Sequence, residues 1–122
     1  MKVVAEDHAH VTAKGMIEIG PDGGGTDTYL TQNVLMLDPS ARVDAVPALE
    51  IKTNDVKASH AASIARVTPE DLFYLQSRGI AEREAKAMFV EGFVSEMIEK
   101  IPDESVRNDV LGALLQPTCC GM

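Results

Sequence analysis

The spacing of apolar residues changes at about residue 68. Before that point, short stretches either alternate apolar with polar residues or are rich in apolar and β-branched residues, at 11–20, 28–37, 42–53 and 56–63. Turn-forming segments separate them at 21–27, 38–41 and 54–55. This pattern predicts short strands. Strands at such close intervals fit a sandwich, a barrel or a β-solenoid, and periodicity alone does not choose among these.

Beyond residue 68 the apolar residues recur every three to four positions, which predicts helices. Thr68 suits an N-cap, Pro69 suits the first helical position, and Gly79 is a natural stop. The first helix is therefore expected between these residues.

A second helix is predicted over about 82–100, ended by Pro102, and a third over about 104–116, capped by Asp103. Gly92 inside the second helix either permits a close helix crossing or is incidental. The two halves together predict a segregated α+β arrangement, with strands in residues 1–67 and a helical domain with a short tail in residues 68–122.

Composition limits the classes of partner. The chain has 122 residues, no Trp and few aromatic residues, so we expect a modest aliphatic core. Its formal net charge of −8 argues against binding to nucleic acid or to anionic membranes. The apolar runs are too short to span a bilayer. Acidic residues near the N-terminus replace the apolar centre of a signal peptide, so we expect a cytoplasmic protein.

The glycine-rich segment 20–27 invites comparison with phosphate-binding loops. No lysine follows Gly25, as a Walker A motif requires. The segment leads into a predicted strand rather than a helix, so a dinucleotide-binding loop is excluded as well. We expect a turn here and no ATP site in this chain.

Three groups of residues are candidates for metal binding. His8 and His10 would share one face of a strand and, with Glu6 or Asp7, could chelate a metal, although the N-terminal position favours a mobile acidic end. The adjacent Cys119 and Cys120 are unsuited to a mutual disulfide, and they suggest a soft-metal dithiol or two exposed thiols in a tail.

The third candidate is His60, which follows Asp55 by five residues and Glu50 by ten. These carboxylates would orient the imidazole or share a metal with it. From the residues alone, His60 is either a metal ligand or proton carrier, or a histidine with a packing role.

A longer series of motifs resembles one protein family. The elements, in order, are Leu35-Met36-Leu37 before a turn, Pro47-x-Leu49-Glu50-Ile51, Asn54-Asp55-Val56-Lys57, Ser59-His60, Leu72-Phe73-Tyr74-Leu75, Ser77-Arg78-Gly79-Ile80, Glu84-Ala85 and Gly92-Phe93. Their order and spacing resemble the C-terminal part of the SufB/SufD family, scaffold components of SUF iron–sulfur cluster assembly. The chain is similar to a shortened, SufD-like member.

The resemblance implies a short right-handed parallel β-helix, or β-solenoid, followed by a helical domain. It further implies that the helical end binds a SufC-like ABC ATPase, for which Leu72, Phe73, Tyr74 and Phe93 are the candidate contacts. A β-helix edge would pair with a second copy or with a SufB/SufD-like partner. His60 matches the family histidine at that interface, as a candidate iron ligand for a transient iron–sulfur cluster.

The chain also departs from the family pattern around this histidine. Ala58 stands where SufD-like proteins commonly have cysteine, and Ala61 stands where SufB-like proteins have glutamate. No cysteine precedes Cys119, so a strand thiolate that would accept sulfur has no counterpart.

Three hypotheses of function therefore arise. The first is a scaffold or adaptor in iron–sulfur cluster assembly that is not itself an enzyme. The second is a dimeric binding module that kept the fold but lost the cluster chemistry. The third is a free-standing metalloenzyme that uses His8, His10 and His60, which no spacing specifically supports.

Overall fold

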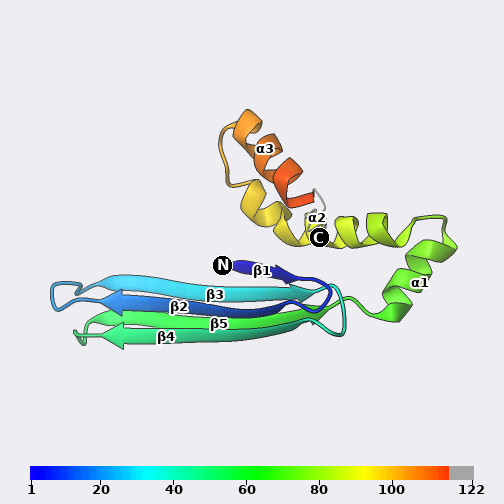
Figure 1. Cartoon of the computed structure of the whole chain (residues 1–122). Coiled ribbons are helices and arrows are strands. Elements are labelled where there is room, and N and C mark those ends of the chain that lie inside the picture. Colours follow the sequence, from blue (N-terminus) through cyan, green and yellow to red (C-terminus); the bar gives the residue numbers. More distant parts are fainter. Residues whose placement is uncertain (116–122) are drawn as a thin grey trace. The chain divides into compact units, whose positions relative to one another are not determined.

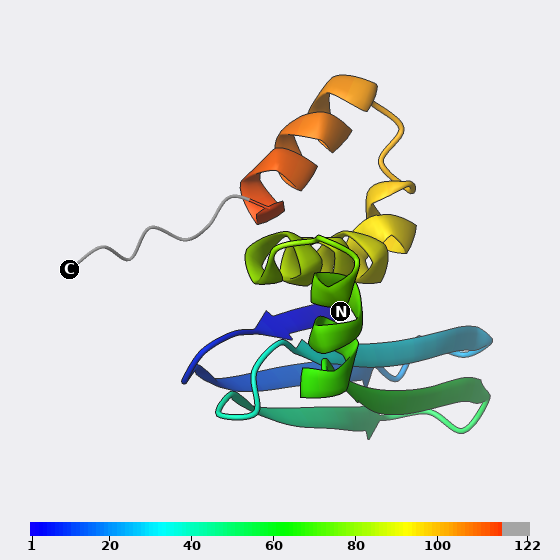
Figure 2. The same cartoon turned by 90° about the vertical axis from the view of Figure 1, so that its right-hand side faces the viewer.

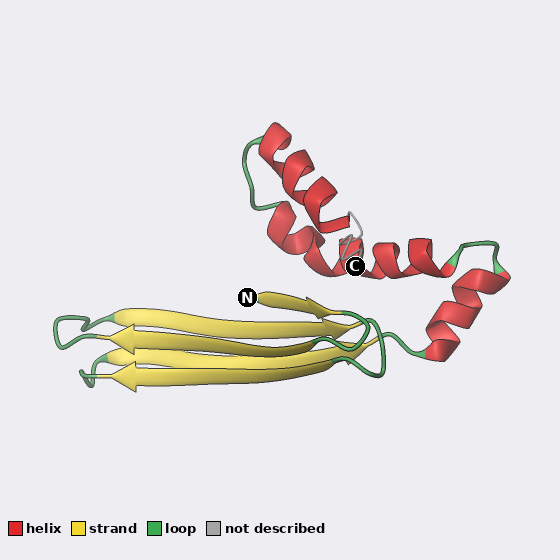
Figure 3. Cartoon of the chain, in the orientation of Figure 1, coloured by secondary structure: helices red, strands yellow, loops and turns green. Residues whose placement is uncertain are grey.

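The computed structural model describes residues 1–115, which form five strands followed by three helices (Figure 1). The strands are β1 (Lys2–Ala5), β2 (His10–Ile19), β3 (Thr26–Met36), β4 (Arg42–Ile51) and β5 (Val56–Arg66). The helices are α1 (Pro69–Ser77), α2 (Glu82–Ile98) and α3 (Glu104–Leu115), coloured red in Figure 3. The predicted order of strands and then helices, an α+β arrangement, is confirmed.

The chain divides into two compact units. The first is Met1–Thr68, which holds all the described strands, and the second begins at Pro69 and holds the helices.

The strands form two parallel sheets, ordered β1-β3-β5 and β2-β4. β2 and β3 each pair without interruption with the strand two positions later in the chain, so His10–Ile19 matches Arg42–Ile51 and Thr26–Met36 matches Val56–Arg66. Consecutive strands therefore alternate between the sheets, and the strands of one sheet run opposite to those of the other (Figure 1).

The prediction of a β-helix is wrong. The described strands form two separate sheets that do not close on each other. The physical reason lies in the loops: residues 20–25, 37–41 and 52–55 return the chain from one long strand to the next and leave no residues for a further face. Figure 2 shows the loops 6–9 and 37–41 beside each other at one end of the strands, where the Asp7 N–H donates to Asp38 Oδ2 at 2.9 Å.

The interior of the first unit lies between the sheets. Gln32 and Val34 of β3 are almost completely buried, at 0% and 1% exposure. Gly15 of β2 permits this close packing, because a Cβ at residue 15 would lie 3.0 Å from both Gln32 Nε2 and Leu30 Cδ2. The side chains at even positions of β3, including Leu30 and Gln32, therefore point toward the sheet formed by β2 and β4.

The helix boundaries follow local chemistry in the second unit. Gly79 has a φ of +87°, a conformation that favours glycine, and ends the turn after α1. The Ala81 N–H donates to Glu84 Oε2 at 3.3 Å at the start of α2. Asp103 Oδ1 accepts the N–H groups of Ser105 at 2.9 Å and Val106 at 3.2 Å, so Asp103 caps α3 as its sequence position indicates.

Helix α2 contacts both α1 and α3 and is apolar on more than one side. Its buried residues are Ala85, Val90, Val94 and Ile98. The apolar Met88 and Met97 of the same helix are 51% and 47% exposed. A Cβ at Gly92 would meet no atom within 4 Å, so this glycine does not mark a close helix crossing among the described residues.

Candidate functional site

His60 lies near the middle of β5 and is exposed. It is the register partner of Leu30, so the imidazole lies on the same side of its sheet as the leucine, the side that faces β2 and β4. Its exposure follows from its position, because β5 is the last strand of the sheet β1-β3-β5. Within residues 1–115 the His60 ring makes no hydrogen bond and no ion pair, which leaves its nitrogens available to a ligand.

The two carboxylates expected near His60 are placed elsewhere. Glu50 lies on β4, and its Oε1 forms an ion pair with Lys52 Nζ at 3.0 Å. Alternation puts Glu50 on the opposite side of its strand from Leu49, away from the space between the sheets. Asp55 lies in the loop after β4, where its carbonyl accepts the Gly25 N–H at 2.6 Å. In the described part of the chain, His60 belongs to no group of three potential metal ligands.

The N-terminal histidines do not form the predicted pair. His8 lies in the loop 6–9, and β2 begins only at His10, so the two residues do not share a strand face. His10 Nε2 lies 2.8 Å from Asp44 Oδ2 on the neighbouring strand. The acidic neighbours Glu6 and Asp7 gather instead with Asp38, their carboxylate oxygens within 4.8 Å of one another. Cys119 and Cys120 lie outside the described residues.

The four expected partner contacts in the helical unit differ in exposure. Phe73 and Tyr74 are 70% and 56% exposed, whereas Leu72 and Phe93 are half-buried. The Arg78 guanidinium carbon lies 4.8 Å from the centre of the Tyr74 ring, a cation–π contact that holds the ring at the surface.

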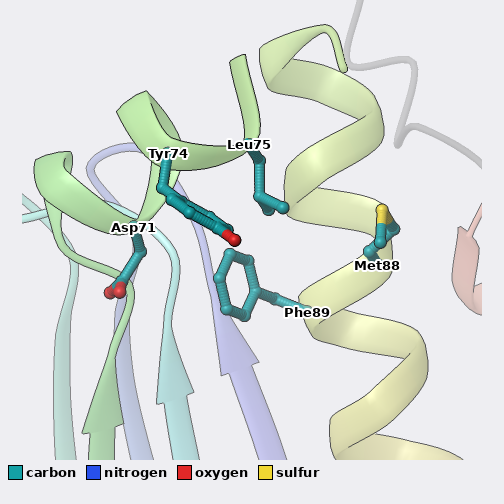
Figure 4. Close-up of a pocket in the computed structure, with 5 residues that line it drawn as sticks. All are labelled: Asp71, Tyr74, Leu75, Met88 and Phe89. Carbon is teal, nitrogen blue, oxygen red and sulfur yellow. The ribbon is translucent and has the colours of Figure 1, made fainter. Parts of the chain in front are cut away.

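A pocket of about 310 Å³ lies between side chains of α1 and α2. Tyr74 and Leu75 of α1 face Met88 and Phe89 of α2 across it, with Asp71 at one side (Figure 4). Of the four expected contacts, only Tyr74 lines this pocket. Leu75, Met88 and Phe89 recur at helical spacing with other apolar residues, a pattern that does not distinguish the lining of a pocket from a core.

Residues 1–93 match the profile of the SufBD core domain, described as SUF system FeS cluster assembly. The chain belongs to the SufB/SufD family. The matched region covers all five strands, α1 and α2 as far as Phe93, and it therefore includes His60 and the pocket.

Relatives within the SufB/SufD family support this assignment. The chain is 36% identical over 115 residues to the iron–sulfur cluster assembly protein SufD of Escherichia coli, a match that covers 94% of this chain and 27% of that protein. It is 41% identical over 113 residues to a SufBD family protein of Mycobacterium leprae, covering 92% of this chain and 29% of the relative. A Mycobacterium tuberculosis SufBD family protein is 42% identical over 107 residues, with 87% and 27% covered. The chain thus spans little more than a quarter of the length of these relatives.

Of the helices in residues 1–115, none combines the length and the apolar character needed to cross a bilayer.

Proposed function

We propose that this chain is a scaffold or adaptor of iron–sulfur cluster assembly, without catalysis of its own, that acts in the cytoplasm. The observation that carries the proposal is the match of residues 1–93 to a domain described as SUF system FeS cluster assembly. The relatives named above are assembly proteins by their printed names. The cluster is cargo in this proposal, held for a time and passed on.

His60 is the residue we propose as an iron ligand for this cargo. It is exposed, lies on a terminal strand and makes no hydrogen bond in the described structure, so binding an iron ion breaks no existing interaction. Imidazole is a suitable ligand for iron. The remaining ligands would be thiolates or sulfide from outside residues 1–115, because iron–sulfur clusters are held chiefly by thiolates.

The helical unit is the part we propose to bind a SufC-like ABC ATPase. Phe73 and Tyr74 expose large aromatic surfaces, and the pocket beside them is lined mainly by apolar side chains. Exposed aromatic residues beside an apolar pocket are typical anchors of protein interfaces.

Calorimetric titration with a purified ABC ATPase of this assembly system tests the adaptor role. Phe73→Ala and Tyr74→Ala should each weaken binding about tenfold or more, since central aromatic anchors contribute over 1 kcal/mol. Val106→Ala on α3, 48% exposed, is the matched control and should bind like the unaltered chain. No heat of binding from the unaltered chain would contradict the adaptor role.

The second candidate is a dimeric binding module that has lost cluster chemistry. One observation favours it: no carboxylate, thiol or second imidazole joins His60 in a potential metal site within the described residues, and its neighbours Ala58 and Ala61 offer no ligand. Anaerobic reconstitution with iron and sulfide separates the two functions. A visible chromophore that is lost in His60→Ala supports the scaffold, and a colourless product from both proteins supports the module.

A further inference from the structure

The pocket between α1 and α2 has one charged lining residue, and that residue is acidic. Tyr74, Leu75, Met88 and Phe89 supply aromatic or aliphatic surface, and Asp71 supplies a carboxylate. We propose that this pocket receives one arginine side chain of the ATPase partner, with the guanidinium at Asp71 and the aliphatic stem against the apolar side chains. The inference rests on the adaptor role proposed above and specifies the chemistry of the contact.

The arrangement of the lining residues matches the two parts of an arginine side chain. In the view of Figure 4, the rings of Tyr74 and Phe89 lie between the Asp71 carboxylate and Met88. Arginine combines an aliphatic stem, which packs on apolar surface, with a charged planar head. The stem therefore suits Met88 and the rings, and the head suits the carboxylate. A wholly aliphatic side chain would remove water from this carboxylate and bring no charge in return, which is unfavourable.

The aromatic rings favour arginine over lysine. A guanidinium stacks on an aromatic face and donates two parallel hydrogen bonds to a carboxylate, whereas an ammonium is a compact, strongly hydrated charge. Tyr74 already shows this preference, because the Arg78 guanidinium carbon lies 4.8 Å from the centre of its ring. Phe89 supplies a second ring within the pocket. A guanidinium from the partner therefore finds both an aromatic surface and a carboxylate in the same pocket.

The charge of the whole helical unit favours a basic partner surface. Residues 69–115 contain ten acidic residues and five basic ones. Four of the basic residues have partners inside the unit: Lys86 pairs with Glu82, Lys100 pairs with Glu96, Arg78 lies at the Tyr74 ring, and Arg107 donates to the Ile101 carbonyl. No basic residue of the described chain lines the pocket. An acidic surface attracts a basic one over long range, so a partner arginine is guided toward this unit.

Two substitutions that remove the same charge separate the pocket from the general charge of α1. Asp71→Asn should weaken binding of the purified ATPase at least about tenfold in calorimetric titration, because a partly desolvated ion pair is lost. Glu70→Gln removes a charge one residue earlier, outside the lining, and should change the affinity less than about twofold. The affinity of the unaltered chain should fall as salt rises, and that of Asp71→Asn should fall less steeply.

A second variant avoids the first turn of α1, where the charge of Asp71 also stabilises the helix end. Met88→Lys places a long cationic side chain of this chain at the pocket, and it should also weaken binding of the ATPase at least about tenfold. Met88→Leu keeps an apolar side chain of similar size and should bind like the unaltered chain. Circular dichroism confirms that each variant is folded before its affinity is compared.

The pocket is also testable without the ATPase. In a nuclear magnetic resonance titration, N-acetyl-arginine amide should shift the ring signals of Tyr74 and Phe89. N-acetyl-citrulline amide has nearly the same shape without the charge and should shift them much less. Asp71→Asn should lose the response to the arginine amide, and Glu70→Gln should keep it.

Equal effects of Asp71→Asn and Glu70→Gln on ATPase binding would overturn the proposal, as would equal responses to the two amides. Binding that is lost in Met88→Lys but unchanged in Asp71→Asn would overturn it as well, because a neutral side chain would then occupy the pocket. If the unaltered chain responds to the arginine amide and yet does not bind the ATPase, the adaptor role fails and the preference of the pocket for a guanidinium is supported.

Discussion

His60 and Leu30 are register partners in the parallel strand pair β3–β5. Leu30 is partly covered by Gly15 of the opposite sheet, whereas His60, one strand further out, is exposed. On this side of the sheet, Leu30 of β3 packs against the opposite sheet, whereas His60 of β5, the last described strand, is exposed. At this exposed edge His60 contributes little to the packing between the sheets, which has a consequence for stability.

His60→Ala should leave the stability of the monomer almost unchanged. The side chain is exposed and makes no hydrogen bond in the described structure, so we expect a change of less than about 0.5 kcal/mol in the free energy of unfolding. Urea denaturation followed by circular dichroism, at a concentration where the chain is monomeric, measures it. A loss of about 2 kcal/mol would instead indicate that His60 packs into the interior.

Gln32→Leu should stabilise the first unit. Gln32 is fully buried, its Nε2 makes one long hydrogen bond of 3.3 Å to the Ala13 carbonyl, and its Oε1 has no partner in the described structure. An unsatisfied buried acceptor costs about 1–3 kcal/mol, so an apolar side chain of similar size should raise the free energy of unfolding by about 1 kcal/mol.

Val34→Ala is the control for this substitution, since Val34 is buried on the same side of β3. Removal of its methyl groups should lower the free energy of unfolding by about 2 kcal/mol. If Gln32→Leu lowers the free energy of unfolding as much as Val34→Ala does, the prediction is contradicted. The side-chain amide of Gln32 would then make a larger contribution than its one long hydrogen bond accounts for.

Two glycines of the helical unit should respond to alanine in opposite directions. Gly79 has a φ of +87°, so Gly79→Ala should cost roughly 1–2 kcal/mol of stability. Gly92 lies inside α2 with open space at its Cβ position, so Gly92→Ala should add about 0.5–1 kcal/mol. Thermal unfolding of both variants, monitored by helical circular dichroism, measures the difference. The same sign for both would contradict the backbone geometry described here.

Asp103→Ala should destabilise α3 by about 1 kcal/mol, because Asp103 Oδ1 accepts two main-chain N–H groups at the start of that helix. Asp103→Asn keeps an acceptor oxygen at this position and should retain most of the stability. Hydrogen exchange of the Ser105 and Val106 amides reports the cap directly. Unchanged exchange in Asp103→Ala would mean that the cap makes no contribution.

Local chemistry made much of the fold predictable from the sequence. Pro69, Gly79 and Asp103 set helix boundaries that differ little from those observed, because capping and turn preferences act within a few residues. The four long strands were also located, although their ends moved by up to three residues, as for β5, which continues to Arg66, whereas β1 (Lys2–Ala5) was not predicted. The β-helix was implied by the family resemblance, and that prediction is wrong. Periodicity defines strands but not how they divide between sheets.

The candidate site was less predictable, because it depends on contacts between strands. His8 and His10 alternate in sequence, yet β2 begins at His10, and the His10 ring pairs with Asp44 on another strand. The burial of Gln32 was not predicted, although the sequence indicates it. Gln32 lies two residues from both Leu30 and Val34, so on a strand its side chain points to the same side as theirs.

The proposal that His60 binds the iron of a transient cluster is tested most directly by pulsed electron paramagnetic resonance. The chain is reconstituted anaerobically with iron and sulfide and then reduced, and nitrogen couplings to the paramagnetic cluster are recorded. We predict a histidine nitrogen coupling in the unaltered chain and in His10→Ala, and its loss in His60→Ala. A coupling that persists in His60→Ala, or a cluster that shows none in the unaltered chain, would contradict the account.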